Sequence, residues 1–425
     1  MRLVYSALFI LLLPLVVLRL LLRSRRAPAY RRRLLERLGW FALPEDPRPL
    51  LWVHAVSLGE TLAARPLLER MLEELPQYRL LVTTTTPTGS AQVRRLFGDR
   101  VLHVYAPWDT PGSVLRFLRR TRPTLLVLME TELWPNTLHY CQRQGCRVLL
   151  ANARLSARSA AGYARFPRST RDMLAAIDRI AAQGSADAER FRQLGMDPER
   201  IEVSGSIKFD VQMSEELRDE AAGLRDAWGL DQRLVLVFAS THAGEDEIAL
   251  QVFTQLRETC PNALLLLVPR HPERFESVFA LCGQSGWRVL RRSADAAVDA
   301  QTDVLLVDSL GELLLFYGIA DLAVIGGSFI DKGGHNPLEA SAWGVPVLCG
   351  PSMFNFSEVA ARLQAVDALE QVADARALAA ALQRLGQDPD ERQRRGAAAR
   401  EVMAANRGAL AALFTAVERL LFAHR

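Results

Sequence analysis

Short apolar runs alternate with amphipathic stretches along most of this chain, and that alternation limits the fold more than any other feature. The runs are almost continuously apolar, which is typical of strands that are buried on both faces of a parallel sheet. Stretches with helical spacing, at 61–75, 111–120 and 186–194, lie between them. In the front half the predicted strands are 50–56, 78–84, 100–106, 124–129, 146–151, 179–183 and 201–205. The pattern predicts an α/β fold with a doubly wound parallel sheet.

The pattern restarts in the back half, where the predicted strands are 234–239, 263–268, 288–291, 304–307, 322–325 and 345–348. The polar stretch 213–232 separates the two sets, and a length of 425 residues also suits two domains rather than one. We therefore expect two Rossmann-like domains, at 38–210 and 211–375, followed by closing helices at 376–425. Two such domains that face each other form a cleft between the carboxyl ends of their sheets, where ligands bind.

The first 37 residues differ from the rest in composition. Residues 3–18 are apolar apart from Tyr5 and Ser6, and residues 20–22 extend the run close to the ~20 residues that cross a bilayer. An arginine-rich segment follows, with only one acid, Glu36. Its arginines are Arg19, Arg23, Arg25, Arg26, Arg31, Arg32, Arg33 and Arg37. We interpret residues 1–37 as a membrane anchor with a basic juxtamembrane segment, which suits anionic lipid and places the rest of the chain in the cytoplasm.

Two other interpretations of this segment stay open. A cleaved signal peptide requires small residues after the apolar core, where this chain has arginines. A helix that lies in the membrane interface agrees with Pro14 and Arg19, which both interrupt a clean span. Nucleic acid is not expected as a partner, because no set of aromatic residues at base-stacking spacing accompanies the arginines.

The remaining composition argues against several classes of chemistry. The 5 cysteines show no CxxC spacing, which indicates neither a disulfide framework nor a zinc site and favours a reducing compartment. No Walker A or GxSxG pattern is present. The 7 histidines lack metal-ligand spacing, and the Asp-x-Asp at 388–390 lies in the C-terminal helical region. We therefore expect no metal ion and no other cofactor in catalysis.

Glu60 is the first candidate for chemistry in the front half. It follows Ser57 and Gly59 where a predicted strand gives way to a helix, so it lies at the mouth of the expected cleft. The alternative role is structural, because a first-turn carboxylate three residues after a serine completes a capping box.

Glu130 and Lys208 also follow predicted strands. Glu130 comes directly after the strand 124–129, with a second carboxylate at Glu132, and the alternative role of this stretch is to cap a helix through Thr131 or Glu132. Lysine occurs elsewhere only at Lys332, so its presence at 208 indicates a site that needs a compact ammonium rather than a guanidinium. The alternative is a solvated lysine in a linker.

The back half has several strand-end motifs that suit a nucleotide, at 240–242, 269–275, 310–313 and 326–339. In the last of these, glycines let a loop approach a ligand closely, and a helix start at Asn336–Pro337 offers free N–H groups to a phosphate. Glu339 lies one turn further on and can accept hydrogen bonds from ribose hydroxyls. One pair of glycines alone would indicate only a turn, but several such motifs together predict a nucleotide site.

Together with 54–60 and 130–135, these motifs resemble the 3-deoxy-D-manno-octulosonic acid (Kdo) transferases of lipopolysaccharide synthesis, over nearly the whole chain. The resemblance implies the GT-B glycosyltransferase fold, in which two Rossmann-like domains face a cleft. It implies CMP-Kdo as the donor and lipid IVA, a tetraacylated disaccharide bisphosphate, as the acceptor. It also implies an inverting, metal-independent transfer at the inner leaflet of the inner membrane.

The resemblance implies roles for particular residues. Glu60 is implied to be the general base, and Glu130 and Lys208 are implied to be transition-state stabilisers. The implied contacts of the CMP moiety are Pro269, Arg270, Leu310, Gly311, Glu312, Asn336, Pro337, Leu338 and Glu339. Two other functions remain as alternatives: a GT-B enzyme that uses another nucleotide sugar, such as a UDP-sugar, and a membrane-bound nucleotide-binding scaffold without turnover.

Overall fold

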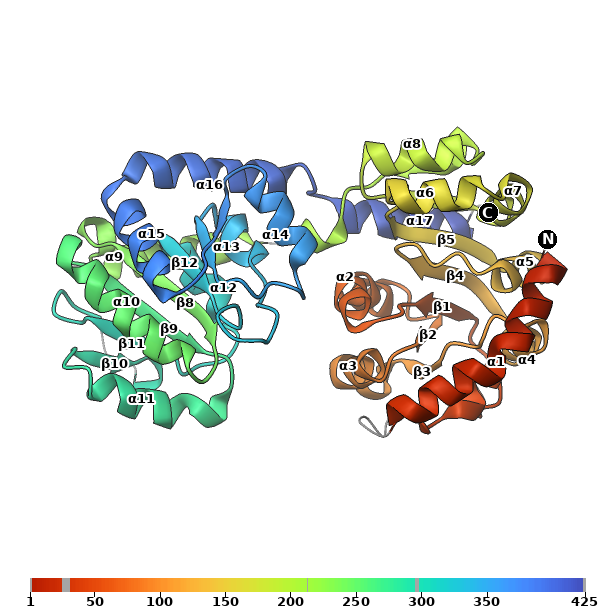
Figure 1. The fold of residues 1–425 in the computed structure, drawn as a ribbon, viewed down its shortest axis with the longest axis horizontal. Coiled ribbons are helices and arrows are strands. Elements are labelled where there is room, and N and C mark those ends of the chain that lie inside the picture. The colour runs from red at the N-terminus through yellow and green to blue at the C-terminus, as the bar shows by residue number, and fades with distance from the viewer. Residues whose placement is uncertain (1, 25–30, 212, 295–297, 423–425) are drawn as a thin grey trace. The chain divides into compact units, whose positions relative to one another are not determined.

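The computed structural model describes residues 2–24, 31–211, 213–294 and 298–422. The chain forms two compact units, which we call the first unit (Met1–Asp210 with Asn406–Arg425) and the second unit (Val211–Ala405) (Figure 1). Each unit is built on one seven-stranded sheet whose neighbouring strands all pair in parallel. The expected α/β architecture of two doubly wound sheets is confirmed.

The sheet of the first unit has the strand order β3-β2-β1-β4-β5-β6-β7. Its strands are β1 (Leu50–His54), β2 (Arg79–Thr84), β3 (Leu102–Tyr105), β4 (Pro123–Met129), β5 (Arg147–Ala153), β6 (Arg179–Ala182) and β7 (Ile201–Val203). β1 is buried along its whole length, because helices cover both faces of the sheet. The strand order reverses between β1 and β4, and ligands of such sheets bind beside that reversal at the carboxyl ends of the strands.

The helices of the first unit begin at signals that the sequence carries. Thr86 and Thr110 each accept a backbone N–H, from Gly89 at 3.1 Å and from Ser113 at 3.3 Å, and a proline follows each threonine. The helices are α1 (Arg2–Ser24), α2 (Leu58–Glu74), α3 (Pro87–Phe97), α4 (Pro111–Thr121), α5 (Pro135–Arg143), α6 (Ala157–Ala164), α7 (Pro167–Ala175), α8 (Ser185–Gln193) and α17 (Ala409–Phe422). Short 3-10 turns are η2 (Leu34–Leu38), η3 (Gly98–Arg100), η4 (Pro198–Arg200) and η5 (Ile207–Phe209).

The sheet of the second unit has the order β10-β11-β9-β8-β12-β13-β14. Its strands are β8 (Val235–Thr241), β9 (Leu264–Pro269), β10 (Val289–Arg291), β11 (Val304–Leu306), β12 (Leu322–Ile325), β13 (Val347–Cys349) and β14 (Leu369–Gln371). Its helices and turns are α9 (Glu215–Ala227), η6 (Leu230–Gln232), α10 (Glu245–Thr259), η7 (Pro272–Arg274), α11 (Phe275–Gly283), η8 (Arg292–Ala294), α12 (Leu313–Gly318), α13 (Leu338–Trp343), α14 (Ser357–Gln364), α15 (Ala375–Gln387) and α16 (Pro389–Ala404). The order reverses between β9 and β12 around β8, so the motifs after these three strands meet at one edge of the sheet.

The helices expected at 376–425 are divided between the two units. α15 and α16 belong to the second unit, where Asp388 caps α16 by accepting the N–H of Glu391 at 2.8 Å. α17 returns to the first unit and packs beside β5, where Leu413, Phe414 and Val417 are buried in one apolar layer of the core (Figure 1).

The predicted anchor corresponds to α1, which contains a candidate membrane span at Arg2–Leu20. Two arginines of the expected lipid-facing cluster are engaged by the protein itself. Arg33 pairs with Glu36 at 2.6 Å, and the buried Arg37 donates to the carbonyl of Thr85 at 2.7 Å. Arg25 and Arg26 lie outside the described residues, as does the side chain of Arg23.

Candidate active site

Glu60 lies in the first turn of α2, directly after the carboxyl end of β1. Ser57 is the N-cap: its hydroxyl accepts the N–H of Glu60 at 3.4 Å and donates to the Glu60 carboxylate at 3.0 Å. The other carboxylate oxygen of Glu60 accepts the N–H of Val56 at 2.8 Å. The capping role is therefore present, and it fixes the direction of the carboxylate at the edge of the sheet where ligands bind.

The environment of Glu60 favours its neutral form. Burial raises its pKa to about 7, and the negative charges of Glu130 and Glu132 contribute to the increase, against the lowering effect of the bonds from Val56 and Ser57. A carboxyl group with a pKa near neutrality can accept a proton from a substrate hydroxyl and release it again at physiological pH. The same group therefore caps a helix and has the acidity of a general base.

Glu130 and Lys208 form an ion pair, with 2.7 Å between Nζ of the lysine and Oε1 of the glutamate. Glu130 follows β4 with a φ of 59°, a left-handed conformation that is uncommon outside glycine and is concentrated at functional sites. Lys208 lies in η5, which packs against α2. The three residues predicted from the front half are therefore neighbours, and Lys208 is not a solvated linker residue.

Glu132 is a third carboxylate in this group, close enough for its charge to act on Glu60. Burial raises the pKa of its side chain, the hydrogen bond from Trp134 lowers it, and the charge of Glu130 raises it further. The alternative role of this stretch as a helix cap is wrong, because α5 has Trp134 at its N-cap without a capping side chain. Glu132 was visible as the second acid of Glu-x-Glu, but only the fold brings it beside Glu60.

In the second unit, burial raises the pKa of Glu339, against the lowering effects of the hydrogen bond from Asn336 and of the nearby charge of Arg270. Asn336 joins the group through its amide, which donates to Glu339 at 3.1 Å and accepts the N–H of Leu338 at 3.1 Å. α13 begins at Leu338 rather than at 336–337 and spans only 6 residues, so its dipole contributes little. The side chains of Arg270, Asn336 and Glu339 are therefore better placed than the helix end to bind an anion and hydroxyl groups of a ligand.

The remaining predicted nucleotide contacts lie on neighbouring elements. Pro269 ends β9 beside Thr241 of β8. Gly311 has a φ of 90°, and Leu310 is 69% exposed in the loop between β11 and α12. Arg292 pairs with Glu312 at 2.8 Å and holds this loop.

Three further residues at this edge were not among the predicted contacts: His242, Glu245 and His335. The Glu245 carboxylate is fully buried and accepts three backbone N–H groups, from His242 at 3.0 Å, from Gly327 at 2.7 Å and from Phe329 at 3.0 Å. His242 and His335 share a hydrogen bond between their Nε2 atoms at 2.9 Å. Glu245 therefore fixes two loops whose histidines meet.

Burial and the nearby positive charges favour the neutral form of both histidines. Burial lowers the pKa of His335 to about 4, with Arg270 as the next cause, and burial followed by the charge of His271 lowers the pKa of His242. The glycines allow the close approach: a Cβ at Gly326 would lie 2.5 Å from the carbonyl oxygen of Ser240. The strand-end motifs indicated this region of the second unit. The contact between His242 and His335, however, depends on the order of the strands in the sheet.

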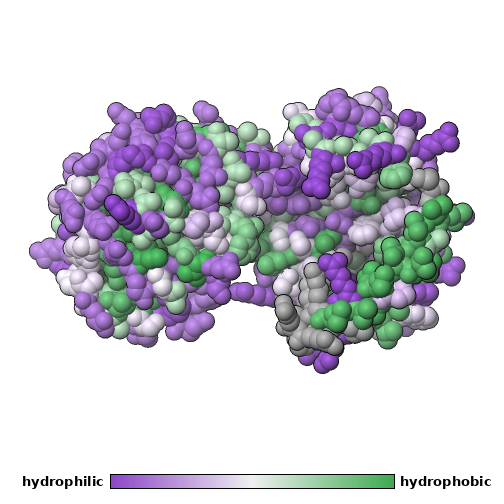
Figure 2. Space-filling model, viewed as in Figure 1, coloured by the Kyte–Doolittle hydropathy of each residue, from purple (hydrophilic) through white to green (hydrophobic). Residues whose placement is uncertain are grey.

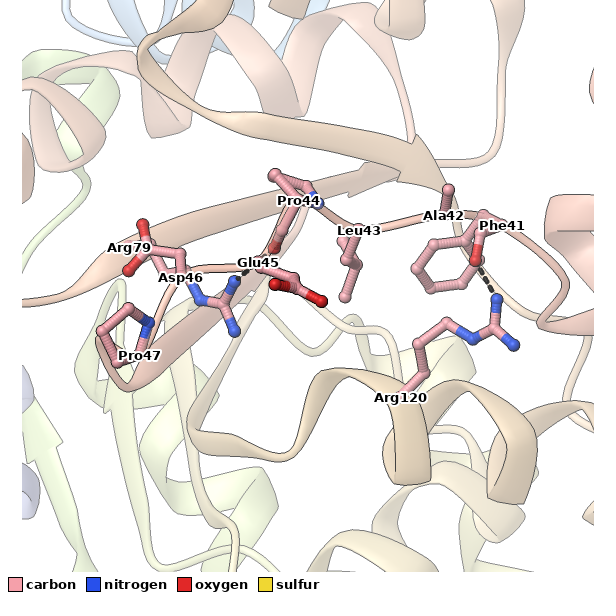
Figure 3. Close-up of a pocket in the computed structure, with 9 residues that line it drawn as sticks. All are labelled: Phe41, Ala42, Leu43, Pro44, Glu45, Asp46, Pro47, Arg79 and Arg120. Atoms are coloured by element: carbon pink, nitrogen blue, oxygen red, sulfur yellow. Dashed lines mark hydrogen bonds between the residues drawn. The ribbon is translucent and has the colours of Figure 1, made fainter.

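An open groove of about 730 Å³ lies elsewhere on the first unit (Figure 3). Its lining residues are Phe41, Ala42, Leu43, Pro44, Glu45, Asp46, Pro47, Arg79 and Arg120. Arg79 donates to the carbonyl of Pro44 at 3.2 Å, and Arg120 donates to that of Phe41. The groove contains none of the predicted site residues and borders the amino-terminal start of β2, away from the ligand-binding edge. Among the described residues no group of three or more His, Cys, Asp and Glu side chains is placed to hold a metal ion.

Two doubly wound parallel sheets, one in each unit, are the architecture of the GT-B class of glycosyltransferases. A family model described as "Glycosyl transferases group 1" matches residues 236–402, which agrees with this class. The model for 3-deoxy-D-manno-octulosonic-acid transferase (kdotransferase) matches residues 32–211.

The chain is similar to curated members of that second family along its length. It is 42% identical over 411 residues to the 3-deoxy-D-manno-octulosonic acid transferase of Haemophilus influenzae, with 96% of each chain covered. It is 42% identical to the transferase of Bordetella pertussis, with 88% of each chain covered. Among solved structures, the C-terminal CMP-Kdo binding domain of WaaA from Acinetobacter baumannii is 33% identical, with a TM-score of 0.43, over 44% of this chain and 98% of that one. This chain belongs to the 3-deoxy-D-manno-octulosonic acid transferase family.

Proposed function

We propose that this chain transfers Kdo from CMP-Kdo to a hydroxyl of lipid IVA, with inversion and without a metal ion, at the cytoplasmic face of the inner membrane. One observation carries the proposal: Glu60, Glu130 and Lys208 gather at the carboxyl edge of the first sheet in a chain that is 42% identical to a Kdo transferase over 96% of its length. The attachment to the membrane surface is proposed to run through α1, which is long and apolar enough for that role.

In the proposed mechanism Glu60 acts as the general base. Its carboxylate removes the proton from the acceptor hydroxyl while that oxygen forms a bond to the anomeric carbon of Kdo. The bond from that carbon to the phosphate oxygen breaks, and CMP leaves with the electron pair. An inverting displacement needs the base and the leaving group on opposite faces of the anomeric carbon. The pKa of about 7 suits a base that must be regenerated in each cycle.

Lys208 is proposed to stabilise charge on the sugar. Kdo carries a carboxylate at its anomeric carbon, and an ammonium held in place by Glu130 can pair with it as the bond to CMP breaks. Arg270 is proposed to stabilise the negative charge that grows on the departing phosphate. Asn336 and Glu339, joined by a hydrogen bond of 3.1 Å, are proposed to hold the ribose, together with the backbone of Leu310 and Gly311.

The test is to incubate the purified chain with CMP-Kdo and lipid IVA and to measure the masses of the products. Each transfer adds one Kdo residue to the lipid, and the absence of any addition would contradict the proposal. If a UDP-sugar were the donor, UDP rather than CMP would inhibit the reaction. A scaffold without turnover would bind CMP and yield no product with any donor.

Replacing Arg270 with alanine is expected to weaken CMP binding by roughly 10- to 100-fold, because a hydrogen bond to a charged group contributes about 1.5–3 kcal/mol. Isothermal titration with CMP measures the change. Arg394→Ala is the matched control, since Arg394 is exposed on α16 of the same unit, a helix that follows another helix rather than a strand. Equal affinity in the Arg270 variant and its control would remove Arg270 from the donor site.

Replacing Glu132 with glutamine is expected to shift the pH dependence of transfer to lower pH. The charge of Glu132 helps to raise the pKa of Glu60. Removing that charge lowers the pKa of Glu60, so the base ionises at a lower pH. The profile of kcat/KM against pH measures the shift. An unchanged profile would mean that Glu60 is not the group that titrates.

A further inference from the structure

One side of α1 lies against the first unit along the whole helix. The residues of this inner side, which are buried or partly buried, are Arg2, Tyr5, Ser6, Phe9, Leu13, Val16, Val17, Leu20 and Ser24. Their spacing of three and four residues is the period of one helix face. Phe9 borders a cavity of about 60 Å³ that Trp52, Trp108 and Trp134 of the first unit also line. Ser6 and Ser24, near the two ends of the helix, are buried, so both ends of α1 lie against the protein.

The outer side of α1 is apolar and exposed. Its residues are Leu3, Val4, Leu8, Ile10, Leu11, Leu12, Leu15, Leu18 and Leu22, each at least half exposed. In Figure 2 they form a continuous green strip on the surface of the first unit, where Figure 1 places α1. Exposing an apolar strip of this length to water is unfavourable, so the strip indicates a lipid or protein partner.

The amino end of α1 is fastened to a rigid part of the first unit. The amide oxygen of the buried Asn136 accepts from Nη1 of Arg2 at 3.0 Å and from the hydroxyl of Ser6 at 3.1 Å. Tyr5 donates to Asp109, which also accepts the N–H of Asn136 at 2.9 Å. Asn136 is thus held on both sides and cannot follow a helix that moves away.

The chain beyond the other end of α1 is fastened to the same unit. Arg33 donates to the carbonyl of His103 at 2.8 Å and to the hydroxyl of Ser90 at 3.0 Å. The guanidinium of Arg37 lies 4.3 Å from the ring centre of Tyr105. The amino end of α1 and the chain beyond its carboxyl end therefore both contact the rest of the first unit.

These contacts conflict with a helix that crosses the bilayer. At 1.5 Å per residue the 23 residues of α1 extend about 34 Å, and crossing a hydrocarbon core of about 30 Å would put the two ends on opposite sides. Arg2, Tyr5 and Ser6 would then lose Asn136 and Asp109, and the inner side of the helix would exchange protein for lipid. A helix in the plane of the interface keeps every one of these contacts.

We propose that α1 does not span the membrane but lies in the plane of its cytoplasmic surface, with the inner side on the first unit and the outer side among the lipid acyl chains. The exposed Arg19, Arg31 and Arg32 fit the headgroups of anionic phospholipids. The amino terminus then stays on the same side of the membrane as both units. This inference rests on the membrane attachment proposed above and on nothing about the sugar or the acceptor.

The side on which the amino terminus lies can be tested by labelling. A short tag with one cysteine is placed ahead of Met1 in a full-length chain in which Cys260, the one native cysteine that is partly exposed, is replaced by alanine. A membrane-impermeant maleimide should leave the tag unlabelled in spheroplasts and label it in inverted vesicles. Labelling in spheroplasts would overturn the proposal, whether or not the chain transfers Kdo.

A matched pair of variants tests the two sides of the helix. Leu11 is 73% exposed on the outer side, and Leu13 lies two residues away on the inner side. Leu11→Gln should weaken the binding of the purified chain to vesicles of phosphatidylethanolamine and phosphatidylglycerol by about tenfold, and Leu13→Gln by no more than about twofold. A spanning helix surrounded by lipid would lose equally from both changes, and no loss from Leu11→Gln would mean that a protein covers the outer side.

Discussion

Replacing Glu60 with glutamine is expected to slow sugar transfer by about 10²- to 10⁴-fold, the range that a positioned general base contributes, while CMP binding stays within about twofold. Glutamine has the shape of glutamate and keeps one oxygen for the N–H of Val56, but it does not accept a proton. The rate of product formation and the affinity for CMP are measured on the same preparation. Thermal unfolding of the variant shows whether the loss of the cap costs more than the ~1 kcal/mol expected for such a group.

The pH profile separates the base from a merely structural residue. Because Glu60 acts in its ionised form and its pKa is about 7, transfer by the unmodified chain should rise as the pH increases through 7. That rise should disappear in the Glu60→Gln variant. Glu73→Gln, on an exposed face of the same helix, serves as the control and should leave the rate unchanged. Full activity in the Glu60 variant would refute the assigned base.

Replacing Glu245 with alanine is expected to destabilise the second unit by about 3–5 kcal/mol. The change leaves the N–H groups of His242, Gly327 and Phe329 without their acceptor, and each buried N–H that loses its partner costs roughly 1–3 kcal/mol. CMP affinity should fall as well, since Glu245 joins the loop of His242 to the glycine loop that leads to His335. Denaturant unfolding and titration with CMP measure the two effects.

The control for Glu245 lies two residues further along the same helix. Glu247 is exposed on α10, so Glu247→Ala should change the stability by less than about 0.5 kcal/mol. If both variants unfolded at the same denaturant concentration, the three hydrogen bonds would contribute nothing to the stability of the second unit. If Glu245→Ala lost stability but kept its CMP affinity, the two loops would not need this carboxylate to hold the nucleotide.

The fold was predictable because parallel strands that are covered on both faces must be apolar throughout. Every strand from β1 to β13 overlaps a strand that the sequence pattern predicts. β14 (Leu369–Gln371) was not predicted, since its sequence Leu-Glu-Gln contains one apolar residue and forms no apolar run. The packing of α17 on the first unit was not predictable either. The pattern of an amphipathic helix shows that one of its sides is buried, but it does not show which sheet that side packs against.

The candidate site was predictable where a residue suited to catalysis directly follows a predicted strand. Glu60, Glu130 and Lys208 each follow a strand, and the strands of a parallel sheet end at the same edge, so their grouping could be expected. Glu245 was not assigned, because it acts on Gly327 and Phe329, more than 80 residues away. Such pairs depend on the strand order, which periodicity does not reveal. The proximity of His242 and His335 follows from the same pairing of β8 with β12.

The two points at which the chain passes between the units lie side by side. The carboxylate of Asp210, the last residue before the second unit, accepts the N–H groups of Gly408 at 3.3 Å and Leu410 at 2.8 Å, just after the chain returns. The second unit is therefore a single uninterrupted insert within the first unit, whose core includes α17. Such an insert can be exchanged for that of another glycosyltransferase as one cassette, and the host keeps every residue of its own hydrophobic interior.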